Sequence, residues 1–354
     1  MNKKILIIFT ALTILFTGCS QFLPANTAES EEIPVSSSTE TTESVTETTA
    51  ETTKEAEPFV FQRHVHTNLL SQYVTEDMWQ SLYNYIDAIY AGEDSFECTD
   101  KKAYEWCTDE AVIGTFFPPV CTFLEGAGFK DGVAKFKYKM DKDKLHERIA
   151  AFEKEIEKML NEATRSDYSD FEKVMSLYDY ICKHFVYDFN PLDGQGIDDF
   201  SDYACLMKKN GICCEIASAY SYLLMQCGVE ATSMGGDGTG GFHAWTYVKI
   251  GDMGYHVDAT WGLHGEYPDA DLNLQYFMMT EAERKSIFEK EMRPDCLWPW
   301  VDKCDMERFP ATDDKFVQMH EEGGCYFRKM NTVDNTITYI DSRGNPVTVS
   351  YGDM

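Results

Sequence analysis

Large apolar side chains recur three or four positions apart in four stretches, at about residues 79–89, 145–159, 171–185 and 213–224. This period predicts four amphipathic helices, each with one face turned toward a core. The acidic turn Thr75–Asp77 precedes the first helix, and Gly228 follows the last one at the position of a C-cap. A capping-box pattern at Thr280–Glu283 predicts the start of a further short helix.

Alternating apolar and polar residues predict strands in other parts of the chain. One strand is predicted at residues 132–140. Near the C-terminus, alternation at 326–328, 336–340 and 347–351 predicts two or three antiparallel strands with a turn at Gly344–Asn345. These strands would form either an added hairpin sheet on the same domain or a small accessory lobe.

A predicted hairpin is made of residues 243–250 and 254–261. Loops of two or of four residues both pair odd-numbered with even-numbered positions, so either register puts His243 and Asp258 on one face. With the shorter loop Asp258 is a diagonal neighbour of His243, within reach of its imidazole. The glycine-dense segment Gly235–Gly241 lacks the lysine of a phosphate-binding loop, and we interpret it as a flexible loop leading to His243.

The helix predicted at 213–224 begins with a cysteine, Cys213. At a helix N-terminus the macrodipole and the free N–H groups stabilise a thiolate, and the same N–H groups can form part of an oxyanion hole. Together with His243 and Asp258, this thiol completes the set that thiol-based acyl transfer needs. The thiolate attacks, the imidazole takes and returns the proton, and the carboxylate fixes the imidazole tautomer.

The motifs around these residues resemble the transglutaminase-like superfamily, whose members are relatives of papain-type cysteine peptidases. The resemblance covers about Tyr168 to Glu283 and depends on several motifs in the same order as in the family. The central ones are Gly-Ile-Cys213-x-x-x-Ala217, His243-Ala-Trp245 and Val-Asp258-Ala-Thr-Trp261. The lead-in Tyr187-Asp188 and Tyr203–Leu206 precedes them, and Tyr276–Glu281 follows them. One departure is Glu215-Ile216, which stands where the family usually has a glycine and an aromatic residue.

This resemblance implies an α+β fold with a papain/transglutaminase-like core, in which the nucleophile helix packs on an antiparallel sheet. A mainly helical lead-in would precede the core, and a β-hairpin region would follow it. The implied activity is cleavage or transfer at amide bonds of a protein or peptide substrate, with Cys213 as nucleophile, His243 as general base and then acid, Asp258 as orienting carboxylate, and no cofactor. Residues predicted to line the substrate groove or to supply an oxyanion donor are Tyr203, Gln195, Trp245 and Trp261.

The sequence is compatible with two different acyl acceptors and with an inactive alternative. The acyl group could pass to water, as in a peptidase or deamidase, or to an amine, as in crosslinking. The alternative hypothesis is a catalytically inactive binding module on a membrane tether, which keeps the fold without turnover.

A second thiol, Cys214, stands next to the predicted nucleophile. Neighbouring residues of a helix are about 100° apart, so Cys213 and Cys214 cannot both face His243. We predict that Cys214 points aside, as a buried small hydrophobe or a disulfide partner. No C-x-x-C pattern occurs, and neither His64-Val-His66 nor Asp269-x-Asp271-x-Asn273 completes a ligand set, so no metal is predicted.

The N-terminus has the pattern of a secretion signal, with Lys3-Lys4, an apolar run at 5–16 and Thr17-Gly18-Cys19. The run is shorter than the roughly 20 residues of a membrane-spanning helix. Its ending resembles the lipobox of bacterial lipoproteins, which implies lipidation of Cys19; an ordinary cleavable signal is the alternative. We therefore expect a protein anchored by lipid on the extracellular face of the bacterial cell membrane.

The net charge of −29, from 31 basic and 60 acidic residues, argues against nucleic acid as a partner.

Residues 20–57 are rich in Thr, Glu and Ser and have almost no apolar side chains whose burial could offset the entropy cost of ordering. The predicted organisation is a signal peptide at 1–19, a disordered tether at 20–57, a mixed α/β lead-in at 58–164, a transglutaminase-like catalytic core at 165–295, and a β-containing extension at 296–354.

Overall fold

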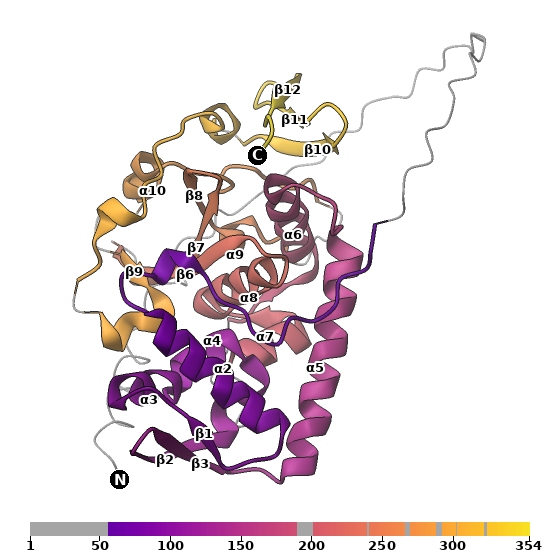
Figure 1. The fold of residues 1–354 in the computed structure, drawn as a ribbon. Helices are drawn as coiled ribbons and strands as arrows, with labels where there is room; N and C mark the ends of the chain where they lie inside the picture. The colour runs from indigo at the N-terminus through magenta and orange to yellow at the C-terminus, as the bar shows by residue number, and fades with distance from the viewer. Residues whose placement is uncertain are drawn as a thin grey trace.

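The computed structural model describes residues 56–189, 201–238, 241–265, 270–287, 292–301, 303–321 and 324–354 (Figure 1). The predicted signal peptide, nearly all of the predicted tether, and Gln195 lie outside these residues. Within them the chain is an α+β protein with antiparallel sheets and a mainly helical N-terminal part, as predicted. None of the helices in these ranges is both long and apolar enough to span a membrane.

The N-terminal part combines helices with a small antiparallel sheet of order β1-β3-β2. Its elements are η2 (Asn68–Leu70), α2 (Glu76–Tyr90), β1 (Ser95–Glu97), α3 (Lys101–Cys107), α4 (Glu110–Phe116), η3 (Pro118–Phe123), β2 (Leu124–Lys130), β3 (Val133–Tyr138) and α5 (Lys142–Ala163). The side chains of Thr75 and Asp141 cap α2 and α5, and both helices confirm their predicted apolar stripes. The sequence pattern did not predict β2, because a bulge between Gly126 and Gly128 interrupts its alternation.

The central part holds a four-stranded antiparallel sheet of order β8-β7-β6-β9, with α8 packed on β6 and β7. Its elements are α6 (Asp170–His184), β4 (Val186–Tyr187), α7 (Asp202–Lys208), β5 (Asn210–Gly211), α8 (Cys213–Gln226), β6 (Glu230–Gly238), β7 (Gly241–Ile250), β8 (Met253–Val257), α9 (Ala259–Gly262), α10 (Glu281–Ile287) and β9 (Met292–Pro294). Helix α8 ends at a left-handed Gly228, and the N–H of Val229 bonds back to the carbonyl of Leu224 (3.0 Å), as in a Schellman motif.

The β7–β8 hairpin has the shorter of the two predicted loops, because Ile250 pairs with Met253. Gly251 takes a positive φ of 57° at the first position of the turn, which a side chain would disfavour. The second strand ends at Val257, so the prediction of a strand through Trp261 is wrong for its last four residues. There Asp258 caps the short helix α9, and the helix takes the chain out of the sheet.

The glycine-dense segment before His243 also differs from its prediction as a flexible loop. Strand β6 continues to Gly238 and β7 begins at Gly241, so the described part of this segment belongs to the sheet. Gly235 has a structural reason to be glycine: a Cβ atom there would come within 2.5 Å of the Phe242 ring. His243 is therefore held inside a paired strand, opposite Gly236.

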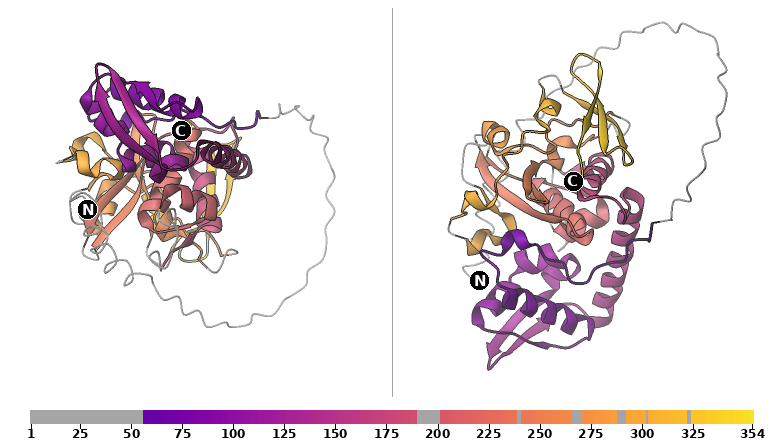
Figure 2. Two further views of the ribbon diagram at one scale, coloured as in Figure 1. Left: turned by 90° about the horizontal axis from the view of Figure 1, so that it is seen from below. Right: turned by 45° about the horizontal axis from the view of Figure 1, so that its top comes forward.

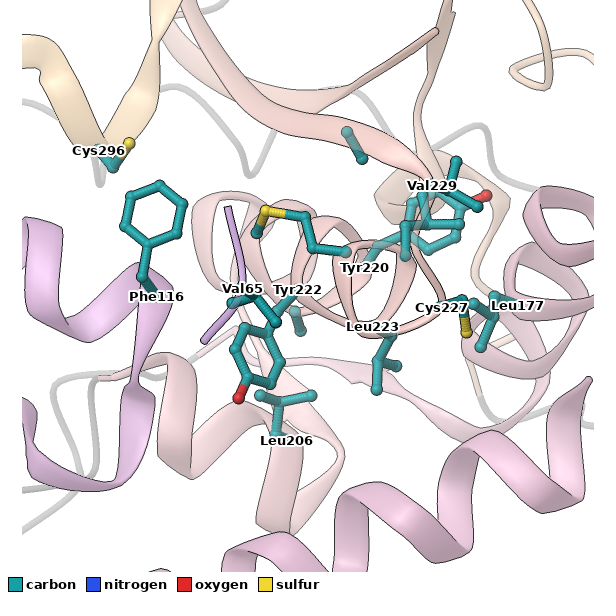
Figure 3. Packing of buried hydrophobic residues seen from close by; sticks show 14 of the residues in the cluster. Val65, Phe116, Leu177, Leu206, Tyr220, Tyr222, Leu223, Cys227, Val229 and Cys296 are labelled. Atoms are coloured by element: carbon teal, nitrogen blue, oxygen red, sulfur yellow. The ribbon is translucent and has the colours of Figure 1, made fainter. Parts of the chain in front are cut away.

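Helix α8 lies in the middle of a continuous buried cluster that reaches from Val65 to Tyr351. Figure 3 shows Phe116 of α4, Leu206 of α7 and Leu177 of α6 around it. Burial on nearly all sides explains why α8 is apolar around most of its circumference and less amphipathic than α2.

The C-terminal part contains η5 (Asp295–Trp300), η6 (Met306–Arg308), η7 (Val317–His320) and a sheet of β10 (Tyr326–Asn331), β11 (Thr336–Ile340) and β12 (Pro346–Ser350). This sheet confirms the predicted antiparallel strands. It lies at the opposite end of the molecule from the β1-β3-β2 sheet, with the central sheet and α8 between them (Figures 1 and 2). Tyr351 stacks on Phe171 of α6 (4.4 Å between ring centroids), which ties the chain end to the central part.

Candidate active site

Cys213 is the first residue of α8 and is 1% exposed. The short strand β5 leads directly into it, and Ile212 is the N-cap residue. The Glu215 side chain accepts a hydrogen bond from the backbone N–H of Ile212 through Oε2 (2.9 Å), which closes the first turn. A Cβ atom at Gly211 would come within 2.9 Å of the Cys205 sulfur, so this approach to the helix requires glycine.

His243 and Asp258 form a buried pair at the end of the β7–β8 hairpin. Nε2 of the imidazole lies 2.7 Å from Oδ2 of the carboxylate, and the two residues are 4% and 2% exposed. The other carboxylate oxygen, Oδ1, accepts a hydrogen bond from the backbone N–H of Trp261 (3.2 Å). Because α9 holds the carboxylate and the carboxylate bonds Nε2, the imidazole ring is held in one orientation.

The two predicted tryptophans both lie next to this imidazole. The Trp261 ring stacks at 5.0 Å between centroids and 27° between planes, and the Trp245 ring at 6.3 Å and 21°. Trp261 in turn meets the edge of Tyr276 (5.0 Å). Two indoles nearly parallel to the imidazole restrict its rotation, and their faces favour a positive charge on it.

The other predicted groove residues are placed differently. Tyr203, in α7, stacks on Phe152 of α5 (5.7 Å), and the Arg148 guanidinium lies 3.2 Å from the centre of its ring. The Tyr203 ring therefore packs against side chains of α5. Gln195 lies outside the described residues.

Three carboxyl groups around the first turns of α8 were not anticipated from the sequence, and one of them, Asp202, accepts a hydrogen bond from the Ser218 hydroxyl. Burial raises the pKa of Glu215 to about 8, and it raises the pKa values of Asp202 and Asp295 to about 7. Repulsion from the Cys213 thiolate adds to the effect on Glu215 and Asp295. These residues come from α7, α8 and η5, so periodicity within any one element could not have brought them together.

Cys214 is partly exposed and packs against Ala217, Phe242 and Ala244. Burial and the neighbouring Cys213 thiol raise its pKa well above that of a free cysteine, with the hydrogen bond to that thiol as the larger cause. No disulfide joins any of the cysteines in the described ranges, so the predicted disulfide alternative for Cys214 is wrong. A raised pKa disfavours the nucleophilic thiolate form.

The described part of the chain contains no group of three His, Cys, Asp or Glu side chains arranged to hold a metal ion. His64 instead bonds the Asp87 carboxylate (3.0 Å), and His66 bonds the hydroxyl of Tyr83 (2.8 Å). Asp271 pairs with Arg328, which lowers the pKa of the carboxyl. Asn273, the other described member of that motif, accepts a hydrogen bond from the Gln275 N–H through Oδ1 (2.9 Å).

Residues 157–259 match the family model of the transglutaminase-like superfamily. This segment is transglutaminase-like. It contains Cys213, His243 and Asp258, and it ends just after the carboxylate that caps α9. The family match confirms the resemblance drawn from the motifs.

None of the curated proteins matches the chain. Among solved structures, a TGase matches with 16% identity and a TM-score of 0.26, covering 39% of this chain and 45% of its own. A candidate cysteine protease from Cytophaga hutchinsonii matches with 16% identity and a TM-score of 0.22, covering 39% of this chain and 61% of its own. The chain thus spans less than two thirds of each of these two chains.

Proposed function

We propose that the protein is a cysteine-dependent enzyme that transfers or hydrolyses acyl groups at amide bonds of proteins or peptides. The observation that carries this proposal is the buried 2.7 Å pair of His243 and Asp258 inside a transglutaminase-like segment whose α8 begins with Cys213. Burial of a polar His–Asp pair costs free energy, which a catalytic role would explain. A thiol at a helix N-terminus, where the thiolate is stabilised, is the group that such an imidazole would activate.

In this proposal the Cys213 thiol gives its proton to Nδ1 of His243, and the thiolate attacks the amide carbonyl. Backbone N–H groups in the first turn of α8 stabilise the oxyanion of the tetrahedral intermediate. The C–N bond then breaks, the amine leaves with the proton from the imidazolium, and a thioester remains on Cys213. Water or a second amine attacks this thioester, and His243 again takes and returns the proton while Asp258 keeps its orientation.

A test is incubation of the purified protein with a glutamine-rich protein and a primary amine, followed by mass spectrometry. Crosslinking or amine incorporation is accompanied by loss of ammonia, about 17 Da, deamidation by a gain of about 1 Da, and proteolysis by new chain termini. Each product should disappear in Cys213→Ala. Products that persist in this variant, with the protein still folded, would contradict the proposal.

A binding module without turnover is the second candidate, and the burial of Cys213 favours it. A thiol that is 1% exposed has to be uncovered before it can meet a substrate. Alkylation by iodoacetamide separates the two functions, because an activated cysteine reacts near neutral pH and a buried structural one does not. A Cys213 that stays unmodified while the protein is folded would favour the binding module.

We also propose that the protein is secreted and anchored by lipid at Cys19, from the pattern of residues 1–19. Protein or peptide substrates would then be met at the extracellular face of the membrane, without nucleic acid as a partner. Cys19→Ala should release the protein into the soluble fraction, and continued membrane retention would argue against lipidation there.

A further inference from the structure

The central sheet carries a second buried histidine, His256, which belongs to no predicted motif. It lies in β8, opposite Tyr247 of β7, and is 0% exposed. Both of its ring nitrogens are used. Nδ1 accepts a hydrogen bond from Nε1 of Trp245 (3.1 Å), and Nε2 lies 2.9 Å from Oε2 of Glu281.

These bonds fix the protonation of His256. Trp245 has only an N–H to donate, so Nδ1 must carry a lone pair, and the proton must be on Nε2, which donates it to Glu281. Burial lowers the pKa of His256, with the opposing pull of Glu281 the smaller influence, which is consistent with a neutral ring. His256 therefore joins an indole N–H to a carboxylate in one directed chain of hydrogen bonds.

Helix α10 supplies the far end of this chain. Arg284 bonds Glu281 through two nitrogens (2.8 and 2.7 Å), and Lys285 lies 3.4 Å from the same carboxylate. Arg284 also lies 5.5 Å from the centre of the Trp245 ring. Helix α10 thus holds Trp245 directly through Arg284 and indirectly through His256, although it lies outside the transglutaminase-like segment.

We propose that His256 is a positioning residue that fixes the plane of Trp245 and, through this indole, stabilises the imidazolium form of His243. The proposal builds on the proposed function, in which that imidazolium forms when Cys213 gives up its proton. The charged groups around the two histidines are Asp258 on His243, and Glu281 with Arg284 and Lys285 on His256. Loss of the acceptor at His256 would leave the buried Trp245 N–H unsatisfied and free the ring to turn, so His243 would lose its proton at lower pH.

The chain offers a matched control on the same helix. His320 bonds Glu283 of α10 through Nδ1 (2.6 Å) and the carbonyl of Phe277 through Nε2 (2.6 Å). Like His256, it is a largely buried histidine paired with a glutamate of α10. Substitution of His320 should therefore disturb the anchoring of α10 without changing the hydrogen bond to Trp245.

The experiment is an NMR titration of the His243 ring protons in the full folded protein, which needs no turnover. In His256→Phe the titration midpoint of His243 should fall by about half a pH unit, the size expected from a weakened cation–π contact. His256→Gln, whose amide can both accept from Trp245 and donate to Glu281, should restore most of the shift, and His320→Phe should leave the midpoint unchanged. Glu281→Gln, which keeps the shape of the side chain, should give a smaller shift in the same direction.

A midpoint that stays at the wild-type value in both His256→Phe and Glu281→Gln would overturn the proposal. An equal shift in His320→Phe would also overturn it, because the effect would then come from general loosening of α10. If His256→Phe does not fold, the Glu281→Gln and His256→Gln results decide alone. Failure of the proposed function would appear separately, as a Cys213 that iodoacetamide does not modify in the wild-type protein.

Discussion

The two faces of the central sheet differ in what they bury. On one face, Phe242 and Ala244 of β7 pack against Ala217 of α8, and the Thr246 hydroxyl bonds the Ala217 carbonyl (3.0 Å). Alternation along β7 puts His243, Trp245 and Tyr247 on the other side, where Trp245 and Tyr247 contact His256 of β8. One face is therefore mostly apolar contact with a helix, and the other is a set of aromatic rings with titratable groups between them.

Because of this difference, side chains on one face of β7 mainly contribute to stability, and those on the other face mainly contribute to the candidate site. Apolar side chains toward α8 are replaceable by other apolar side chains of the same volume, because dispersion and burial depend little on identity. Side chains on the other face are bound through specific atoms, Nε2 to Oδ2 at His243 and Nε1 to Nδ1 at Trp245, so even an isosteric change alters the protonation pattern. Substitutions on the two faces should therefore fail in different ways.

The largest expected effect is that of Asp258→Asn, which changes the partner of His243. Asparagine is as good an N-cap for α9 as aspartate, so the Trp261 N–H keeps its acceptor and the fold should persist. The amide would favour the wrong imidazole tautomer, a change that costs about 10⁴-fold in kcat in a serine-protease triad. The measurement is turnover together with a thermal melt.

The matched control for this variant is Asp100→Asn. Asp100 caps α3 by accepting from the Ala103 N–H (2.8 Å), so its substitution makes the same change to a cap far from His243 in sequence. It should leave turnover unchanged. Near wild-type turnover in Asp258→Asn with an unchanged melt would contradict the role of Asp258.

On the α8 face the expected effect is on stability. Ile250, which is buried at the end of β7, should lose about 2–5 kcal/mol of unfolding free energy when changed to Ala, because a cavity forms. Its partner across the hairpin, Met253, is exposed and should cost less than about 0.5 kcal/mol. Denaturant unfolding measures both. A loss of turnover in folded Ile250→Ala larger than its loss of folded population would break the separation of the two faces.

The first turn of α8 contains Glu215, and this residue should make the unfolding free energy depend on pH. Burial raises the pKa of Glu215 in the folded protein from its ordinary value of 4.5 to about 8. Between these values the folded state binds more protons than the unfolded one, so stability falls as pH rises, by up to about 1.4 kcal/mol per pH unit. Glu215→Gln keeps an acceptor for the Ile212 N–H and removes this titration.

The measurement is unfolding free energy against pH. Because burial raises the pKa values of Asp202 and Asp295 to about 7, the flattening in Glu215→Gln should be clearest between about pH 7 and 8. Gln in place of the exposed Glu105 should leave the slope as it is. A wild-type slope in Glu215→Gln would show that this carboxyl is already ionised in the folded protein.

The smallest effect is expected from removal of residues 20–57, which is predicted to leave the rate of Cys213 alkylation unchanged. The adjoining segment is held to α5, where the Phe59 N–H bonds Asn161 (2.8 Å) and the Phe61 N–H bonds Glu157 (3.0 Å), and these contacts remain. Alkylation kinetics and a thermal melt check this. Loss of folding would refute the predicted boundary of the tether.

Long apolar stripes made most of the large helices predictable from the sequence. Helices α2, α5, α6 and α8 each have a repeating buried face, so local periodicity was enough. Helix α9 was missed because four residues cannot show a period, and its formation depends on the Asp258 side chain bonding the Trp261 N–H. The same capping bond explains why β8 ends earlier than its apolar pattern suggested.

Only the part of the site that depends on odd and even positions along paired strands was predictable from the sequence. Parity put His243 and Asp258 on one face, and the structure brings them to 2.7 Å. It carried no information about Glu281, whose contact with His256 joins residues 25 positions apart in different elements. Nor could it indicate the carboxyls around the first turns of α8, because Asp202 and Asp295 come close to this helix only through tertiary packing.

The central claim is that Cys213, and not the adjacent Cys214, is the nucleophile. The most direct test is labelling with a sub-stoichiometric dose of iodoacetamide at about pH 6, where only a stabilised thiolate reacts quickly, followed by peptide mapping. We expect label on Cys213, its disappearance in Cys213→Ala, and its persistence in Cys214→Ala. Preferential labelling of Cys214, or retained turnover in Cys213→Ala, would contradict the assignment of Cys213 and move the nucleophile one residue along α8.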